Sequence, residues 1–194
     1  MKKLALVALV GAAFAISQGA SAKDGTVNFT GEIVDSSCVV KTESQNLTVT
    51  LPRIDKKALT ADGQVAGKVP FEITLESCPA TVTSQGDKTS LDKVKAYFHY
   101  DTSKINANGR VINTYTEANS KTKAANVDIQ ILDSADKVID ISAVTSDSNS
   151  VENSAATTLS NGTVKLRYYA QYYATGVTSP GLVSGSVDYT IAYQ

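Results

Sequence analysis

The last thirty residues of the chain, KLRYYAQYYATGVTSPGLVSGSVDYTIAYQ (165–194), decide the fold. Four apolar residues alternate there with polar or small ones: Val187, Tyr189, Ile191 and Tyr193. This period of two predicts a β-strand with one apolar face that becomes buried. Because terminal residues usually fray, a strand that reaches the carboxyl terminus must be held by a neighbouring strand.

Short runs of β-branched and aromatic residues recur along the chain, separated by turn residues, and no segment has a sustained helical period. We expect strands in eight segments: Val27–Val40, Leu47–Leu51, Val69–Leu75, Lys93–Tyr100, Val127–Leu132, Val138–Ile141, Val164–Tyr173 and Val187–Tyr193. Such a series favours an all-β, immunoglobulin-like β-sandwich. The polar stretch 143–157 is expected to be an exposed loop.

Residues 1–22 have the pattern of a cleaved secretory signal peptide. Two lysines precede an apolar run (4–16), and the small residues ASA (20–22) form a cleavage signal. The apolar run is shorter than the roughly 20 residues of a membrane span. We therefore expect an exported chain that begins at Lys23 and is not embedded in a membrane.

The remaining chain is acidic. It holds 19 acidic residues and 18 − 2 = 16 basic ones, because the signal peptide contains two of the 18, so its formal charge is −3. The charge therefore does not predict the basic surface that a nucleic-acid-binding protein needs.

Two cysteines, Cys38 and Cys78, are the only ones in the sequence. An oxidising compartment favours a disulfide between them. The bridge would close a loop of 40 positions and add about 3–4 kcal/mol. A metal site is the alternative, but it needs more ligands than the nearby sequence offers.

The sequence predicts no catalytic, metal or cofactor site. The one histidine, His99, falls on the strand face opposite Phe98 and Tyr100, where we expect it to face solvent. No nucleophile-elbow or phosphate-binding pattern is present. We expect a protein that is not an enzyme and that needs no cofactor.

A second alternating segment, GTVNFTGEIV (25–34), lies near the expected amino terminus. Its apolar register holds Val27, Phe29, Gly31 and Ile33. The segment could be the first strand of the domain's own sandwich. It could instead complete the sheet of another molecule, with Gly31 at a point where two backbones approach closely.

The chain resembles the major pilin subunits of type 1-like fimbriae, which the chaperone–usher pathway assembles. The resemblance rests on features that occur in order along the chain: the segment 25–34, the cysteine pair 40 positions apart, VDIQILD (127–133), YATG (173–176), Gly181 fourteen from the end, and the penultimate Tyr193.

The resemblance implies an incomplete immunoglobulin-like β-sandwich of six strands, whose seventh strand is donated in trans. Residues 37–194 would form the pilin domain, and 23–36 an extension that carries the donor strand. Its anchors would be Val27, Phe29, Gly31 and Ile33, which fill a groove in the next subunit. That groove would lie along the terminal strand, with chaperone recognition at its end: Gly181, Val187, Tyr189, Ile191, Tyr193 and Gln194.

The expected partners are further copies of the chain and related pilins, a periplasmic chaperone and an outer-membrane usher. The expected location is an extracellular fimbrium, reached through the periplasm. A minor adaptor subunit would share these motifs. A tip adhesin, usually a longer chain with a lectin domain, and a self-contained secreted binding module fit the sequence less well.

Overall fold

The computed structural model describes residues 27, 31, 33–34, 38–83, 90–118, 120–143 and 155–194. The chain divides into two compact units, residues 1–30 and residues 31–194. Val27, which is exposed, is the residue described in the first unit. The expected signal peptide and Phe29 lie outside the described residues. Every element below belongs to the second unit.

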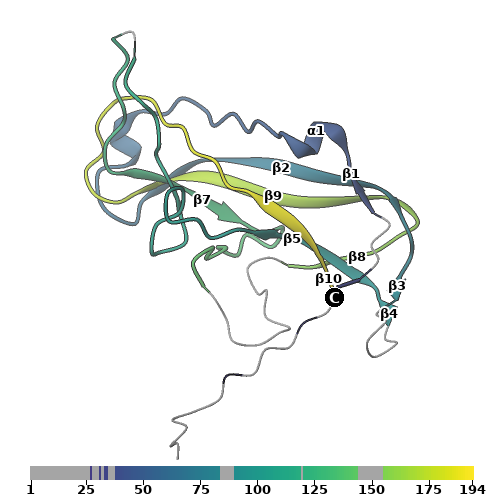
Figure 1. Cartoon of the computed structure of the whole chain (residues 1–194). Coiled ribbons are helices and arrows are strands. Elements are labelled where there is room, and N and C mark those ends of the chain that lie inside the picture. The colour runs from purple at the N-terminus through teal and green to yellow at the C-terminus, as the bar shows by residue number, and fades with distance from the viewer. Residues whose placement is uncertain are drawn as a thin grey trace, which may run out of the picture. The chain divides into compact units, whose positions relative to one another are not determined.

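Strands dominate the second unit (Figure 1). They are β1 (Val39–Val40), β2 (Val65–Cys78), β3 (Val82–Thr83), β4 (Ser90–Leu91), β5 (Lys93–Phe98), β6 (Val111–Ile112), β7 (Val127–Leu132), β8 (Thr157–Thr158), β9 (Gly162–Ala174) and β10 (Tyr189–Tyr193). The described helical elements are a single turn, α1 (Thr42–Gln45), and a 3₁₀ turn, η1 (Lys56–Ala58).

Two sheets form the sandwich. The larger has the strand order β1-β2-β9-β7-β6, and the smaller has the order β10-β5-β8. A separate ribbon pairs β3 with β4. All the named strand pairs are antiparallel, and the longest pairing joins β2 to β9, from Val65 opposite Tyr173 to Cys78 opposite Gly162. This pairing forms the backbone of the larger sheet.

The core lies between the two sheets, where the apolar faces predicted by the alternation meet. Ile73 and Leu75 of β2 are buried against Val94 and Phe98 of β5 in one cluster. The Phe98 and Tyr168 rings meet edge to face at 5.2 Å between centroids. The Ala96 N–H donates a 3.0 Å hydrogen bond to the Tyr168 hydroxyl, so one buried side chain joins the two sheets.

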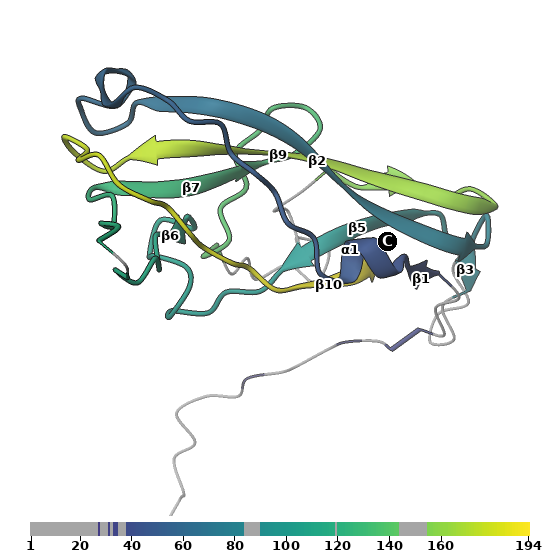
Figure 2. The same cartoon turned by 90° about the horizontal axis from the view of Figure 1, so that it is seen from above.

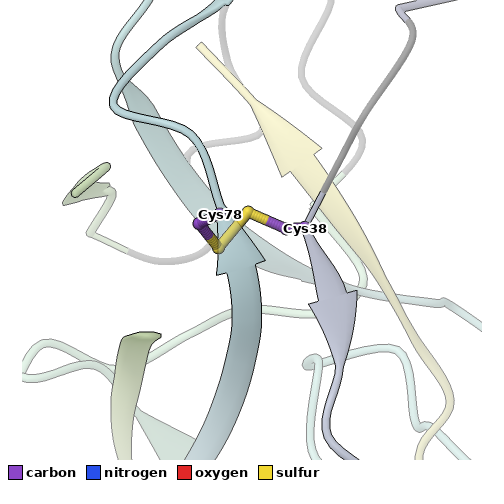
Figure 3. Close-up of a disulfide and its surroundings, with 2 residues drawn as sticks. All are labelled: Cys38 and Cys78. Carbon is purple, nitrogen blue, oxygen red and sulfur yellow. A yellow bond between two sulfur atoms is a disulfide. The ribbon is translucent and has the colours of Figure 1, made fainter. Parts of the chain in front are cut away.

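The expected disulfide is confirmed. Cys38, just before β1, is bonded to Cys78 at the end of β2 (Figure 3). The neighbouring pairing of β1 with β2 is short, with Val39 opposite Glu76 and Val40 opposite Leu75. The covalent bond therefore supports a strand that has only two ladder positions.

Most of the expected strands form, but two do not, and of the expected strand Val27–Val40 only Val39–Val40 (β1) is a strand, while the other described residues of that segment, 27, 31, 33–34 and 38, are not. Residues 47–51 and 138–141 are not strands, and the second segment has only an isolated bridge between Leu132 and Val138. Ile139 and Ile141 are nevertheless buried in the core. Their apolar spacing indicated burial correctly, but their N–H groups donate to two different segments, Ile139 to the Ile131 carbonyl and Ile141 to the Gly109 carbonyl, rather than along one strand. Of the expected loop 143–157, residues 144–154 lie outside the described part of the chain.

The outer face of β2 and β9 carries an exposed ion cluster. Arg167 and Lys165 donate hydrogen bonds to the Glu72 carboxylate at 2.7 and 3.1 Å. These two hydrogen bonds, that from Arg167 first, hold the pKa of Glu72 below its usual value. Among the described residues, no helix is long and apolar enough to cross a bilayer.

Candidate functional site

An apolar cleft of about 600 Å³ opens on one side of the sandwich. One wall is the segment 45–51, which starts at the last residue of α1, and the opposite wall is the segment 185–189, which leads into β10. The floor is made of core side chains from both sheets: Phe71, Ile73, Phe98, Val111, Ile129, Ile131 and Ala170. The cleft therefore exposes part of the core between two chain segments.

The two walls run along the same side of the larger sheet (Figure 2). In the wall 45–51, apolar and polar residues alternate, and Leu47, Val49 and Leu51 line the cleft. This is the segment for which the sequence predicts a strand. It has the alternation of a strand but, among the described residues, no ladder partner.

The β10 edge beside the cleft is open within the described part of the chain, because β10 is the end strand of its sheet. On its other side, β10 pairs with β5. Gln194 and Lys93 exchange hydrogen bonds of 2.9 and 3.0 Å, and the His99 N–H donates to the Asp188 carbonyl at 2.8 Å. Because antiparallel bonding alternates, the backbone groups of Tyr189 and Ile191 point away from β5, toward the open edge.

A hydrogen bond at one end of the cleft joins the two sheets through α1. The Tyr189 hydroxyl donates to the carbonyl of Ser44 at 2.7 Å. The Ser44 hydroxyl in turn accepts a 3.0 Å hydrogen bond from the Thr74 N–H of β2. Ser44 is buried, and burial raises the pKa of Tyr189. We refer to these contacts as the α1 bridge.

A buried asparagine holds the chain that enters the cleft wall. The Asn113 side-chain amide donates to the carbonyls of Ala124 and Leu182 at 2.9 and 3.1 Å, and its oxygen accepts from the Ser184 N–H at 3.0 Å. Gly185 then passes so close to β6 that an added Cβ would lie 2.7 Å from Val111 Cγ1. The glycine lets this wall sit directly against the sheet.

The structure brings together some of the residues that the sequence predicts for the groove. Val187 and Tyr189 line the cleft, whereas Ile191 and Tyr193 continue along β10 and pack against the core. Gln194 pairs with Lys93 at the end of the strand.

Gly181 is not among the residues that line the cleft. A Cβ on Gly181 would collide with the Lys123–Ala124 backbone, so this glycine allows a close chain crossing. The terminal signature of the sequence therefore contains a packing position at Gly181 as well as cleft residues.

The predicted anchors of the extension are described in part. Gly31 is exposed with open space around its Cα, and the Ile33 side chain is 96% exposed. Val34 packs against the core cluster. The described chain thus leaves the core between Val34 and Ile33.

Sequence reasoning missed the wall residues as part of a site, and it missed Ser44 and Gly185. The alternation of Leu47, Val49 and Leu51 was a signal that could have identified the wall. The TESQ sequence of α1 is too short and too polar for a periodicity argument.

The cleft has no chemistry of a catalytic or metal site. Among the described residues, no group of three or more His, Cys, Asp or Glu side chains could hold a metal ion. His99 is exposed as expected, and its Nε2 lies 2.6 Å from the Thr190 hydroxyl. Asp188, on the rim, forms an ion pair with Lys104 at 2.6 Å, and this hydrogen bond raises the pKa of Lys104. The cleft is suited to binding apolar side chains beside an open strand edge.

The family model of fimbrial proteins matches residues 27–194. The chain belongs to the fimbrial protein family. It is 39% identical to the F17 fimbrial protein of Escherichia coli over 94% of both chains. It is 35% identical to the major fimbrial subunit SMF-1 of Stenotrophomonas maltophilia, over 90% of this chain and 95% of that one. A major fimbrial subunit of Haemophilus influenzae is 36% identical over the full length of both.

Solved structures show the same fold. The P pilus rod subunit PapA superposes with a TM-score of 0.54 at 20% identity, covering 82% of this chain and all of PapA. A subunit from a chaperone–usher pilus structure gives a TM-score of 0.57 at 20% identity, over 88% of this chain and 95% of that one. The fold is the incomplete immunoglobulin-like sandwich of pilus subunits.

The family decides the class of function. The chain is a structural subunit of a surface fimbrium, not an enzyme, as are the fimbrial proteins and major fimbrial subunits that it resembles. Several of these relatives are named major fimbrial subunits.

Proposed function

We propose that the fimbrial subunit polymerises head to tail by donor-strand exchange, with residues 23–36 of one copy completing the sandwich of the next. The observation that supports this most directly is the apolar cleft beside the open edge of β10. In this proposal the acceptor groove consists of the cleft and the β10 residues that continue it.

The cleft and the edge supply the two things that an added strand needs. The edge of β10 offers main-chain hydrogen-bonding groups, and the cleft receives every second side chain of the donor. Val27, Phe29 and Ile33 are the anchors, and each contributes about 1.5–3 kcal/mol on full burial. Gly31, between Phe29 and Ile33 in the same register, fits a donor that passes close to the acceptor backbone.

The geometry also supports an open polymer. The donor segment and the acceptor cleft are different surfaces of the same chain, so the contact is heterologous and continues from copy to copy. The disulfide and the α1 bridge stabilise a sandwich that lacks one strand.

We further propose a periplasmic chaperone and an outer-membrane usher as partners on the route to the cell surface. An exposed core and an open strand edge invite aggregation, which gives a reason for a chaperone that covers both until the donor arrives. Tyr193 and the terminal carboxylate of Gln194 lie where β10 ends, so they would be the residues that the chaperone engages there.

A synthetic peptide of residues 25–36 tests the donor and the acceptor together. Monomers of the full exported chain, refolded after heat dissociation of fibres, should unfold at a higher temperature with the peptide than without it. The variant Val187→Asp should lose this shift, because it places a carboxylate in the apolar cleft. Val138→Asp, at an exposed valine outside the cleft, is the matched control. A peptide without effect on the unmodified subunit would refute the proposal.

A deletion of residues 23–33 separates donor from acceptor. The shortened subunit should still accept the peptide and should cap growing fibres, because it has a cleft but no donor strand. Normal fibres made only of this variant would contradict the assignment of the donor.

A further inference from the structure

The second unit has two opposite ends, set by the length of β2. At one end lie Cys38, Cys78 and the terminal residue Gln194; we call this the disulfide end (Figure 2). At the other end, Val65 begins β2, and the loop after β9 approaches the segment that precedes β7. We call this the loop end. The cleft wall 185–189 runs from the loop end toward the disulfide end, where β10 terminates.

The link between the donor strand and its own domain is short. Cys38 is fixed to Cys78, and only 38 − 33 = 5 residue steps separate it from the anchor Ile33. Five extended steps span at most about 18 Å. If Ile33 occupies a neighbour's cleft, the disulfide end of the donor subunit must lie directly against the acceptor.

Head-to-tail growth determines which end of the acceptor contacts the disulfide end of the donor subunit. Each subunit sends its own extension out from the disulfide end. If the incoming subunit also docked at that end, it would occupy the place where the acceptor's own extension leaves the domain to reach a further copy. An open fibre therefore needs the disulfide end of one copy against the loop end of the next. The donor strand then runs antiparallel to β10.

The loop end presents apolar side chains that are exposed in the single subunit. Val177 is 70% exposed, Val65 46% and Leu182 42%. Their backbones are held in place: the Asn126 side chain donates to the Val177 carbonyl at 2.8 Å, and the Ala124 N–H donates to the Leu182 carbonyl at 3.0 Å. Val39, 56% exposed, is an apolar residue of the disulfide end.

We propose that Val65, Val177 and Leu182 form a second contact surface, which binds the disulfide end of the next copy around Val39. This surface adds to the donor strand and continues the cleft, because Leu182 lies three positions before the cleft residue Gly185. The inference rests on the proposed donor-strand exchange and adds a body-to-body contact to it.

Fibres of the full exported chain carrying Val177→Asp or Val39→Asp test this surface. Each variant should dissociate about tenfold faster in denaturant than the unmodified fibre, a change of about 1.4 kcal/mol. Both should bind the peptide 25–36 as the unmodified subunit does, because the peptide has no attached domain. Val138→Asp, the same change at an exposed valine away from both ends, should dissociate like the unmodified fibre.

The outcomes separate the two proposals. If the unmodified subunit does not bind the peptide, donor-strand exchange itself is wrong. If it binds the peptide but Val177→Asp and Val39→Asp fibres dissociate within twofold of the unmodified rate, the second contact surface is wrong. Val138→Asp fibres that dissociate as fast as those of Val177→Asp would also overturn it, and so would a loss of peptide binding in Val177→Asp. In either case the faster dissociation would not arise from contact between the two ends.

Discussion

The α1 bridge gives the sharpest test of how the incomplete sandwich is held together. Tyr189→Phe removes one hydroxyl and leaves the ring in place, 6.5 Å from Phe98 between centroids. The lost hydrogen bond is the 2.7 Å bond to the Ser44 carbonyl. Because Ser44 is buried, its carbonyl would be left without this donor, at a cost of about 1–3 kcal/mol.

Urea unfolding of the refolded monomer measures this cost. We expect the midpoint of Tyr189→Phe to fall while the slope stays unchanged, because the surface exposed on unfolding is the same. Tyr100→Phe is the control, since it also removes a tyrosine hydroxyl, at a residue that is 40% exposed. A change at an exposed site is usually within 0.5 kcal/mol of zero. Equal midpoints for both variants would refute the reasoning.

The pH dependence provides a second measurement on the same variant. Burial raises the pKa of Tyr189 in the folded protein above its unfolded value of about 10. The folded state therefore holds this proton more tightly, and the resulting stability is present below pH 10 and lost as the pH rises through the folded pKa. The unmodified subunit should lose more stability above pH 10 than Tyr189→Phe does. Parallel stability curves for the two would show that Tyr189 does not titrate in this way.

Three further predictions concern the frame around the cleft. Replacing Cys38 and Cys78 together with serine should destabilise the monomer by about 3–4 kcal/mol in thermal or urea unfolding, and an unchanged midpoint would show that the bridge adds no stability. Gly181→Ala should cost about 1–3 kcal/mol, because its Cβ would collide with the backbone next to Ala124; full retention of stability would mean that the chain crossing relaxes. Glu72→Gln should flatten the acid side of the stability profile: the pKa of Glu72 is lowered in the fold, so its stabilisation is present above pH 4.5 and lost as the pH falls through the folded value. An acid limb identical to that of the unmodified subunit would argue against this ion cluster.

The sequence predicted well those strands whose partners lie in the same chain. The bounds of β7 match the expected segment 127–132, and β2 and β9 contain their expected segments and extend beyond them. Each of these segments has strongly alternating apolar residues and pairs with an antiparallel strand of the same domain. The terminal strand is also present, although β10 begins at Tyr189 rather than Val187.

Prediction from the sequence was least accurate for segments whose residues alternate as in a strand but which do not pair with another strand. Segment 47–51 alternates like a strand but lacks a ladder partner among the described residues, and it forms a cleft wall instead. The role of Ser44 could not be predicted from the sequence, because a one-turn helix has no detectable period. Its contact with Tyr189 also joins residues 145 positions apart. The close approach of Gly185 to β6 could not be foreseen either, because it depends on how the chain before β10 crosses that strand in three dimensions.

The disulfide has a mechanical consequence for a fibre under tension. A pull on the proposed donor extension reaches its first covalent cross-link at Cys38, where the disulfide transfers it to Cys78 and the long β2–β9 pairing. The part of the closed loop before β2, which contains β1, α1 and the cleft wall 45–51, is bypassed by this load. The disulfide keeps the whole loop of 40 positions, about 140 Å of extended chain, from being drawn out. Under the proposed donor-strand exchange, the wall beside the neighbour's strand therefore lies outside the direct line of force along the fibre.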